Sequence, residues 1–155
     1  MDADSSEAWD ATVAAVRQYR QALARLSVLP IGEILAETLR KPQSRDTALL
    51  VLADVWDEAK RPAVPELLEL ARGGPGELAW VRQVIRGLPV EVLDEELPGF
   101  VGRVIDDPEA DYWDFRRAAE LLEDLGREEL VQRLVTAGRK SDDPDMIEFV
   151  EDYDA

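Results

Sequence analysis

Residues 106–135 read DDPEADYWDFRRAAELLEDLGREELVQRLV, and this stretch decides the fold. Apolar residues recur every three or four positions from Tyr112 to Leu125, which is the spacing of one buried helix face. Gly126 suits the left-handed conformation that ends such a helix, and a second apolar face follows it. The acids and Pro108 ahead of the first face are typical of a helix start. The stretch therefore predicts two helices joined at Gly126, which form a helical hairpin.

The rest of the chain repeats this pattern. Prolines that suit a helix start stand at positions 42, 75, 108 and 144, which are 33, 33 and 36 residues apart. Five residues after them stand Thr47, Trp80, Trp113 and Phe149, so three of the four units carry an aromatic ring at the same place. A period of this length predicts stacked helical hairpins.

Further helices are expected between these prolines. The first begins at Ser5 or Ser6 and ends between residues 26 and 29, and another covers residues 31–40. Second helices of the hairpins are expected over residues 62–71, 89–106 with a break at Pro98 and Gly99, and 127–137. The first helix has the spacing of one buried stripe, formed by Ala8, Trp9, Val13, Val16, Tyr19, Leu23 and Leu26. Trp9 and Trp56 lie on apolar stripes and are predicted to be core residues.

Residues 115–126, FRRAAELLEDLG, with the apolar positions 130, 131 and 134, resemble the repeat of the HEAT-like helical family. They share an arginine, a pair of small residues, leucines and a glycine between the helices. Residues 48–59 followed by 64–68 are a weaker version. The resemblance implies an all-α solenoid of about four hairpins plus a C-terminal helix, as a single domain over residues 1–155. It also implies a protein-binding scaffold, although a fold alone does not fix a function.

The chain contains no cysteine and no histidine, and this narrows its chemistry. The absence of cysteine excludes disulfides and thiolate metal sites and is compatible with a reducing cytoplasm. Histidine is the commonest general base and transition-metal ligand near neutral pH, so its absence argues against most hydrolases and transferases. We therefore expect a non-enzymatic protein without a metal or other cofactor.

The start of the chain is acidic and polar, unlike a secretory signal, and no run of about 18 apolar residues occurs. The sequence therefore predicts a cytoplasmic protein that does not bind a membrane. Oligomeric state is not indicated.

The formal net charge of -16 is concentrated at one end of the chain. Residues 1–41 carry 6 acids and 5 bases, residues 42–88 carry 7 and 6, and residues 89–155 carry 21 and 7. Direct binding to nucleic acid is disfavoured, because it relies on Lys and Arg against phosphates. The acidic half favours a basic partner protein instead.

Stacking of the second helices predicts that their acids form one face, with Tyr112 and Trp113 near the hairpin junction as candidate anchors. These two residues are about 100° apart on a helix, so both cannot point straight into one core stripe. The predicted partner-binding residues are Glu91, Asp94, Glu95, Glu96, Tyr112, Trp113, Glu128, Glu129, Asp142, Asp143 and Asp145. The alternatives are a merely solubilising role for the acids and burial of both aromatic residues between hairpins.

Three functions remain open. The first is a binding module for a basic protein, whose sharpest form is an immunity or antitoxin-type inhibitor of a basic toxin. The second is a carboxylate-only hydrolase or metal-dependent enzyme, which requires convergent acids with raised pKa values. The third is a structural subunit of a larger assembly, which predicts an exposed apolar end.

Overall fold

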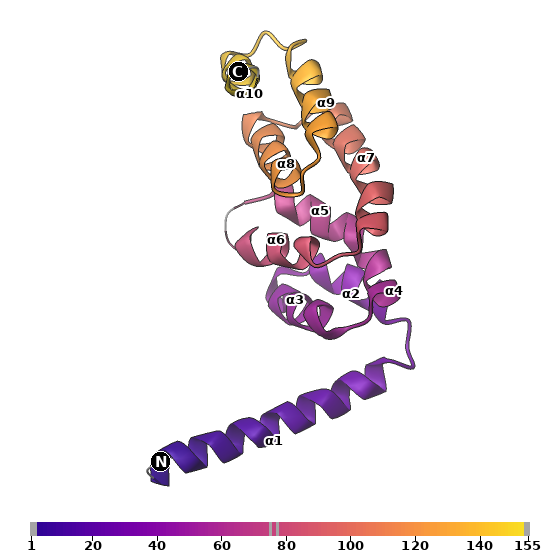
Figure 1. The fold of residues 1–155 in the computed structure, drawn as a ribbon, viewed down its shortest axis with the longest axis vertical. Helices are drawn as coiled ribbons and strands as arrows, with labels where there is room; N and C mark the ends of the chain where they lie inside the picture. Colours follow the sequence, from indigo (N-terminus) through magenta and orange to yellow (C-terminus); the bar gives the residue numbers. More distant parts are fainter. Residues whose placement is uncertain (1–2, 75, 77, 154–155) are drawn as a thin grey trace.

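The computed structural model describes residues 3–74, 76 and 78–153, and every regular element in these ranges is a helix (Figure 1). In chain order the elements are α1 (Ala3–Leu26), α2 (Ile31–Leu39), η1 (Pro42–Ser44), α3 (Arg45–Asp54), α4 (Asp57–Lys60), η2 (Arg61–Ala63), α5 (Val64–Arg72), α6 (Leu78–Arg86), α7 (Val90–Asp106), α8 (Tyr112–Asp124), α9 (Glu128–Gly138) and α10 (Pro144–Tyr153). The prediction of an all-α fold is confirmed.

Helices α2 to α10 form an elongated body, and α1 extends from one end of it (Figure 1). In the body, α5 contacts α7 and α7 contacts α9, so these three helices lie in a row. Helix α8 packs against both α5 and α9, and α10 covers α8 and α9 at the end of the body opposite α1.

The helices form where apolar residues recur at helical spacing, and these residues fill the core. Helix α8 buries Phe115 and Leu122, as the spacing predicts. Phe149 of α10 is fully buried, and its ring meets that of Phe115 at a centroid distance of 5.7 Å. Gly126 has a φ of 67°, which is the left-handed conformation expected at the end of α8.

The predicted helix start at Pro108 is wrong. Helix α8 begins at Tyr112, because Asp111 forms its N-cap. The Asp111 carboxylate accepts hydrogen bonds from the backbone N–H groups of Trp113 (2.8 Å) and Asp114 (3.1 Å). Asp114 in turn accepts from the backbone N–H of Asp111, at 3.1 Å, which completes a capping box.

The predicted break at Pro98 and Gly99 is also wrong, since α7 runs through both residues. Leu97 and Phe100 are fully buried on either side of Pro98. Packing of this face against the body outweighs the hydrogen bond that proline removes. The helix predicted over residues 62–71 begins at Val64, after the short helix η2.

The predicted buried stripe on the first helix is wrong as well. No described side chain of residues 4–26 is buried, and Trp9 and Val16 are 61% and 42% exposed. Helical spacing identifies an apolar face but does not supply a partner for it. Trp56 is 47% exposed and is not a core residue either.

None of the helices among the described residues has the length and apolar character needed to span a bilayer.

Candidate protein-binding surface

Ion pairs link positions about one repeat apart along the body. Arg82 pairs with Glu120 at 2.9 Å and Arg86 with Asp124 at 2.7 Å, and both links join α6 to α8. These and the pairs Arg103–Glu69 and Arg116–Asp152 span 34 to 38 residues of sequence. Each exposed pair contributes little to stability, about 0–1 kcal/mol. Three of these four pairs also neutralise an acid of the C-terminal half, namely Glu120, Asp124 and Asp152.

Several acids counted as excess in the sequence therefore have a basic partner from another helix. Glu95 pairs with Arg61 at 2.5 Å, and Asp152 of α10 pairs with Arg116 of α8 at 2.6 Å. Asp152 accepts this hydrogen bond and thereby raises the pKa of the Arg116 guanidinium. Asp152 therefore has a basic partner that lies 36 residues away in sequence, which a count of charges along the chain does not show.

Three of the predicted site residues meet in one hollow between the N-terminal half of α7 and the start of α9. Its volume is about 640 Å³, and it is lined by Asp94, Leu97, Pro98, Gly126, Arg127, Glu128, Glu129 and Leu130. We call this set of residues the α7–α9 hollow. Arg127 pairs with Asp94 at 2.8 Å. Glu128 and Glu129 are exposed and form no ion pair with any described residue.

The turn between α8 and α9 places these acids. The backbone N–H of Arg127 donates to the Leu122 carbonyl at 2.8 Å, and that of Gly126 donates to Glu123 at 2.9 Å. This geometry ends α8 and starts α9 with only three residues between them, Leu125, Gly126 and Arg127. Glu128 and Glu129 occupy the first turn of α9, where the helix dipole stabilises negative charge.

The remaining predicted acids on α7 lie near this hollow along the same helix. Glu91 is exposed and Glu96 is half-buried, and neither forms an ion pair within the described part of the chain.

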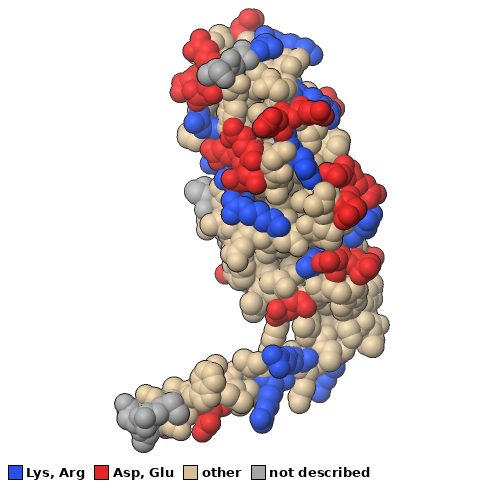
Figure 2. Space-filling model, in the orientation of Figure 1, with Lys and Arg blue, Asp and Glu red and all other residues tan. Residues whose placement is uncertain are grey.

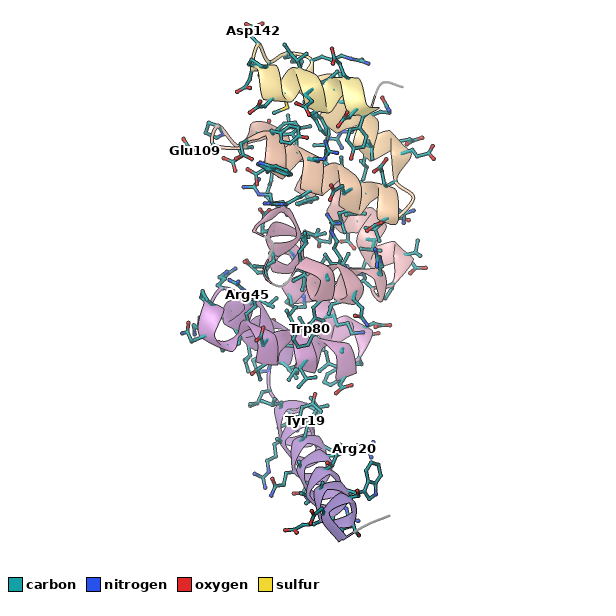
Figure 3. All side chains as sticks on the ribbon, turned by 90° about the vertical axis from the view of Figure 1, so that its left-hand side faces the viewer. Tyr19, Arg20, Arg45, Trp80, Glu109 and Asp142 are labelled. Atoms are coloured by element: carbon teal, nitrogen blue, oxygen red, sulfur yellow. The ribbon has the colours of Figure 1, made fainter. Side chains whose placement is uncertain are left out.

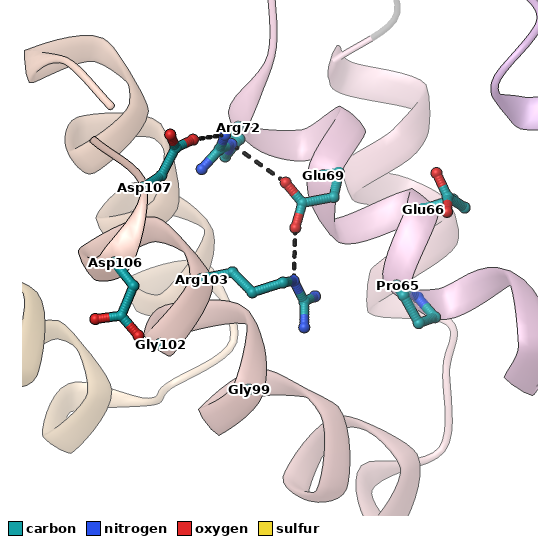
Figure 4. A pocket seen from close by; sticks show the side chains of 9 residues that line it. All are labelled: Pro65, Glu66, Glu69, Arg72, Gly99, Gly102, Arg103, Asp106 and Asp107. Atoms are coloured by element: carbon teal, nitrogen blue, oxygen red, sulfur yellow. Dashed lines mark hydrogen bonds and ion pairs between the residues drawn. The ribbon is translucent and has the colours of Figure 1, made fainter. Parts of the chain in front are cut away.

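A second hollow of about 780 Å³ is an open groove lined by residues of both α5 and α7 (Figure 4). Glu69 of α5 accepts from Arg103 of α7 at 2.8 Å and lies 3.2 Å from Arg72. Arg72 also donates to Asp107, which lowers the pKa of that carboxyl group. Gly99 and Gly102 on α7 add no side chain to this groove. Most charges in the groove are therefore already paired with each other.

Further along α9 the charge changes sign. A third hollow, of about 320 Å³, is lined by Glu129 but also by Arg133 and Lys140. Figure 2 shows acidic and basic side chains interspersed over the body. The predicted acids thus do not form one continuous acidic face.

The other predicted residues lie at a separate edge. Figure 3 shows Glu109, just before α8, on the same side of the molecule as Asp142, just before α10. Asp142, Asp143 and Asp145 are all exposed. Asp143 accepts a hydrogen bond from the backbone N–H of Asp145 at 2.9 Å and so caps α10.

The aromatic pair at the start of α8 contributes one exposed ring. Trp113 is 55% exposed, while Tyr112 is half-buried and accepts a hydrogen bond from Arg116. The guanidinium of Arg117 lies 5.6 Å from the centroid of the Trp113 ring. Trp113 is therefore exposed in the first turn of α8, and it is not among the residues that line the α7–α9 hollow.

Sequence reasoning missed Arg127, Pro98 and Leu130 as lining residues. The sequence marked Pro98 as a helix break and Leu130 as a core position, and neither assignment indicates a hollow. Within the described residues, no group of three or more His, Cys, Asp or Glu side chains is placed to hold a metal ion.

Comparison of the chain with models of protein families, with curated proteins and with solved structures found no match.

Proposed function

We propose that the chain is an α-solenoid of stacked helical hairpins, similar to HEAT-like repeats, that binds a basic protein at the α7–α9 hollow. The row formed by α5, α7 and α9 supports the stacking, as do ion pairs that recur at 34 to 38 residues. In such a stack each unit buries its apolar face only against its neighbours.

One observation carries the binding proposal: the α7–α9 hollow combines an acidic rim with apolar residues. Glu128 and Glu129 supply carboxylates that form no ion pair within the described part of the chain, and Leu130 and Pro98 supply apolar surface. A lysine or arginine side chain fits this combination, because its methylene groups pack on apolar atoms while its charged end reaches a carboxylate. The hollow is therefore suited to basic side chains presented by another protein.

The clustered acids act mainly on association kinetics. Exposed charge pairs are weak and screened by salt, whereas a cluster of one sign accelerates the encounter with an oppositely charged partner. Association is therefore expected to slow as ionic strength rises. The narrower form of the proposal is an immunity or antitoxin-type inhibitor, whose partner is a basic toxin.

The groove between α5 and α7 gives no support to the alternative of a carboxylate-only hydrolase. A general acid requires a raised pKa, whereas Arg72 holds the pKa of Asp107 below its usual value. Glu69 forms ion pairs with Arg72 and Arg103. Both carboxylates thus belong to ion pairs that link α5 to the C-terminal part of α7.

The experiment is affinity capture from the native cell with three forms of the full chain. The test variant carries Glu128→Lys and Glu129→Lys, and the matched control carries Glu148→Lys and Glu151→Lys on α10. Both variants change the net charge by the same amount, and all four glutamates are exposed. We expect the wild type and the control to retain one basic protein that the test variant loses, with association slowed about tenfold or more.

Reversal at the start of α9 also removes a favourable helix-dipole interaction worth about 0.3–1 kcal/mol per residue, so circular dichroism must confirm that the test variant is folded. Equal capture by the test variant and the wild type contradicts the proposal. Loss of capture in both variants also contradicts it, because net charge rather than the α7–α9 hollow then determines binding.

A further inference from the structure

Helix α1 presents an apolar face that the body does not cover. It extends from the end of the body formed by α2, α3 and α4, and most of its length stands clear of the other helices (Figures 1 and 2). Trp9, in the half remote from the body, is 61% exposed. Tyr19, Leu23 and Leu26, nearer the body, pack only partly against the core. This exposed stripe is the feature expected of a subunit of a larger assembly.

The stripe has the spacing of a helix-pairing seam. Trp9, Val16 and Leu23 are seven residues apart, and Tyr19 and Leu26 are also seven apart. Two interleaved sets at this period form the contact line between paired helices, with a drift of about 20° per heptad on a straight helix. Trp9 and Val16, the residues of this line that are exposed and do not pack against the body, are therefore placed to meet a second helix.

The charges of α1 identify the kind of helix that fits. Its acids lie in the half remote from the body and its arginines lie in the half near the body: Asp4, Glu7, Asp10, Arg17, Arg20 and Arg25. None of these six side chains forms an ion pair with another described residue. A second α1 that runs antiparallel sets each acidic half against a basic half, whereas a parallel copy sets like charges together.

The base of α1 contains a hollow where an aromatic side chain fits. Its volume is about 250 Å³, and it is lined by Arg20, Leu23, Ala24, Ser27, Asp54, Val55 and Trp56. The hydroxyl of Tyr19 donates to Asp54 at 2.8 Å and fixes the base of the helix to α3. Trp56 is exposed beside this hollow and offers a ring for contact.

The distances along α1 allow two copies of the chain to place each Trp9 at the base of the other copy's α1. Trp9 precedes Leu23 by 14 residues, or about 21 Å of helix. In an antiparallel pair whose two-fold axis passes near Val16, Trp9 of one chain lies opposite Leu23 of the other. The same register places the acidic half of each α1 at the level of the basic half of the other, so that Glu7 lies at the height of Arg25 along the pair. One arrangement thus satisfies the exposed tryptophan, the hollow and the charges together.

We propose that two copies of this chain associate through antiparallel α1 helices, with each Trp9 seated in the hollow at the base of the other copy's α1. The interface is isologous, because the same surface of each copy meets its equivalent, and it closes with two-fold symmetry. It lies on a different part of the chain from the α7–α9 hollow and does not depend on the binding proposed there.

Sedimentation equilibrium of the full chain tests the association. We expect the mass of two chains at concentrations on the order of 10–100 μM. Trp9→Ala is expected to weaken the dimer about 30-fold or more, as for a central interface tryptophan. Trp113→Ala is the matched control, since this exposed tryptophan lies on α8, and it should leave the dimer unchanged. A wild-type chain that remains monomeric over this range, or equal effects of the two substitutions, overturns the proposal.

Introduced cysteines test the direction of pairing, because the chain has none of its own. Val16→Cys lies near the proposed axis and should form a disulfide between the two copies. In the antiparallel arrangement, Ala8→Cys residues are separated by about 24 Å, beyond the reach of a disulfide. Equal cross-linking of the two variants indicates parallel or random association and overturns the antiparallel arrangement.

Charge reversal provides a further measurement of direction. Arg17→Glu, Arg20→Glu and Arg25→Glu together make α1 acidic throughout and should weaken the dimer at least tenfold. Adding Asp4→Arg, Glu7→Arg and Asp10→Arg restores complementary halves and should restore the dimer. If the dimer of the variant with six substitutions is as weak as that of the variant with three, the acidic and basic halves do not pair.

Discussion

The substitution Phe149→Ala tests whether α10 is held by its neighbours, as the stacked arrangement requires. Phe149 is fully buried, and its ring lies 5.7 Å from that of Phe115 and 5.1 Å from that of Tyr153. Truncation of a buried phenylalanine costs about 3–5 kcal/mol. Helix α10 has 10 residues, and an isolated helix shorter than about 12–15 residues is marginal in water. The loss should therefore detach α10 from α8 and α9.

Hydrogen exchange followed by mass spectrometry measures this effect helix by helix. At about 1.4 kcal/mol for each tenfold change, the lost packing corresponds to roughly two to three and a half orders of magnitude in the opening equilibrium of α10. Amides of α2, α3 and α5 should keep their protection, since α10 packs mainly against α8 and α9. Ile147→Ala, on the exposed side of α10, is the control and should cost about 0.5 kcal/mol or less.

A uniform loss of protection along the whole chain would refute this reasoning. It would mean that the body unfolds as a single cooperative unit, rather than as helices stabilised by their immediate neighbours. Unchanged protection in α10 would equally contradict the packing described for Phe149.

Two other predictions concern glycine and tyrosine. Gly126→Ala should destabilise the fold by about 1–2 kcal/mol, because the φ of 67° at Gly126 disfavours a side chain although no atom lies within 4 Å of the added Cβ. Gly102 is equally open but lies inside α7, so Gly102→Ala should instead stabilise the fold by up to about 1 kcal/mol. Thermal unfolding of both variants measures the two effects. Burial, supported by a hydrogen bond to Asp54, raises the pKa of Tyr19 from 10.0 to about 12, and burial with nearby Glu123 does the same for Tyr153. A folded-state pKa above the unfolded value adds stability that is complete below pH 10 and is lost as pH rises through about 12. Ultraviolet titration should therefore show that Tyr19 and Tyr153 ionise near pH 12, and ionisation of both near 10.0 would contradict the two contacts.

The sequence predicted what depends on local patterns. Residues 31–40 were expected to be a helix and α2 covers Ile31–Leu39, because the apolar spacing and Pro30 act within one turn. Gly126 was identified as a helix end for the same reason. The start of α8 was missed because Pro108 and Asp111 are both plausible start signals, and only the hydrogen bonds of Asp111 and Asp114 distinguish them.

Features that depend on distant contacts were not predictable in this way. The apolar stripe of α1 shows which face is apolar, but its exposure depends on where the body lies. The partner of Asp152 is 36 residues away, so a local count of acids overstates the free negative charge. The α7–α9 hollow combines residues 94–98 with residues 126–130, and only the contact between α7 and α9 brings them together.

Site-specific photo-crosslinking in the native cell tests the central claim most directly. A photoreactive side chain is placed at Glu129, on the rim of the α7–α9 hollow, and in a second variant at Glu148 on α10. The proposed function predicts that a basic protein is covalently trapped from position 129 and not from position 148. When the irradiation is repeated in a lysate, the crosslinking yield from position 129 should fall as salt is added. Trapping of the same protein from position 148 but not from position 129, or a yield at position 129 that is indifferent to salt, would contradict it.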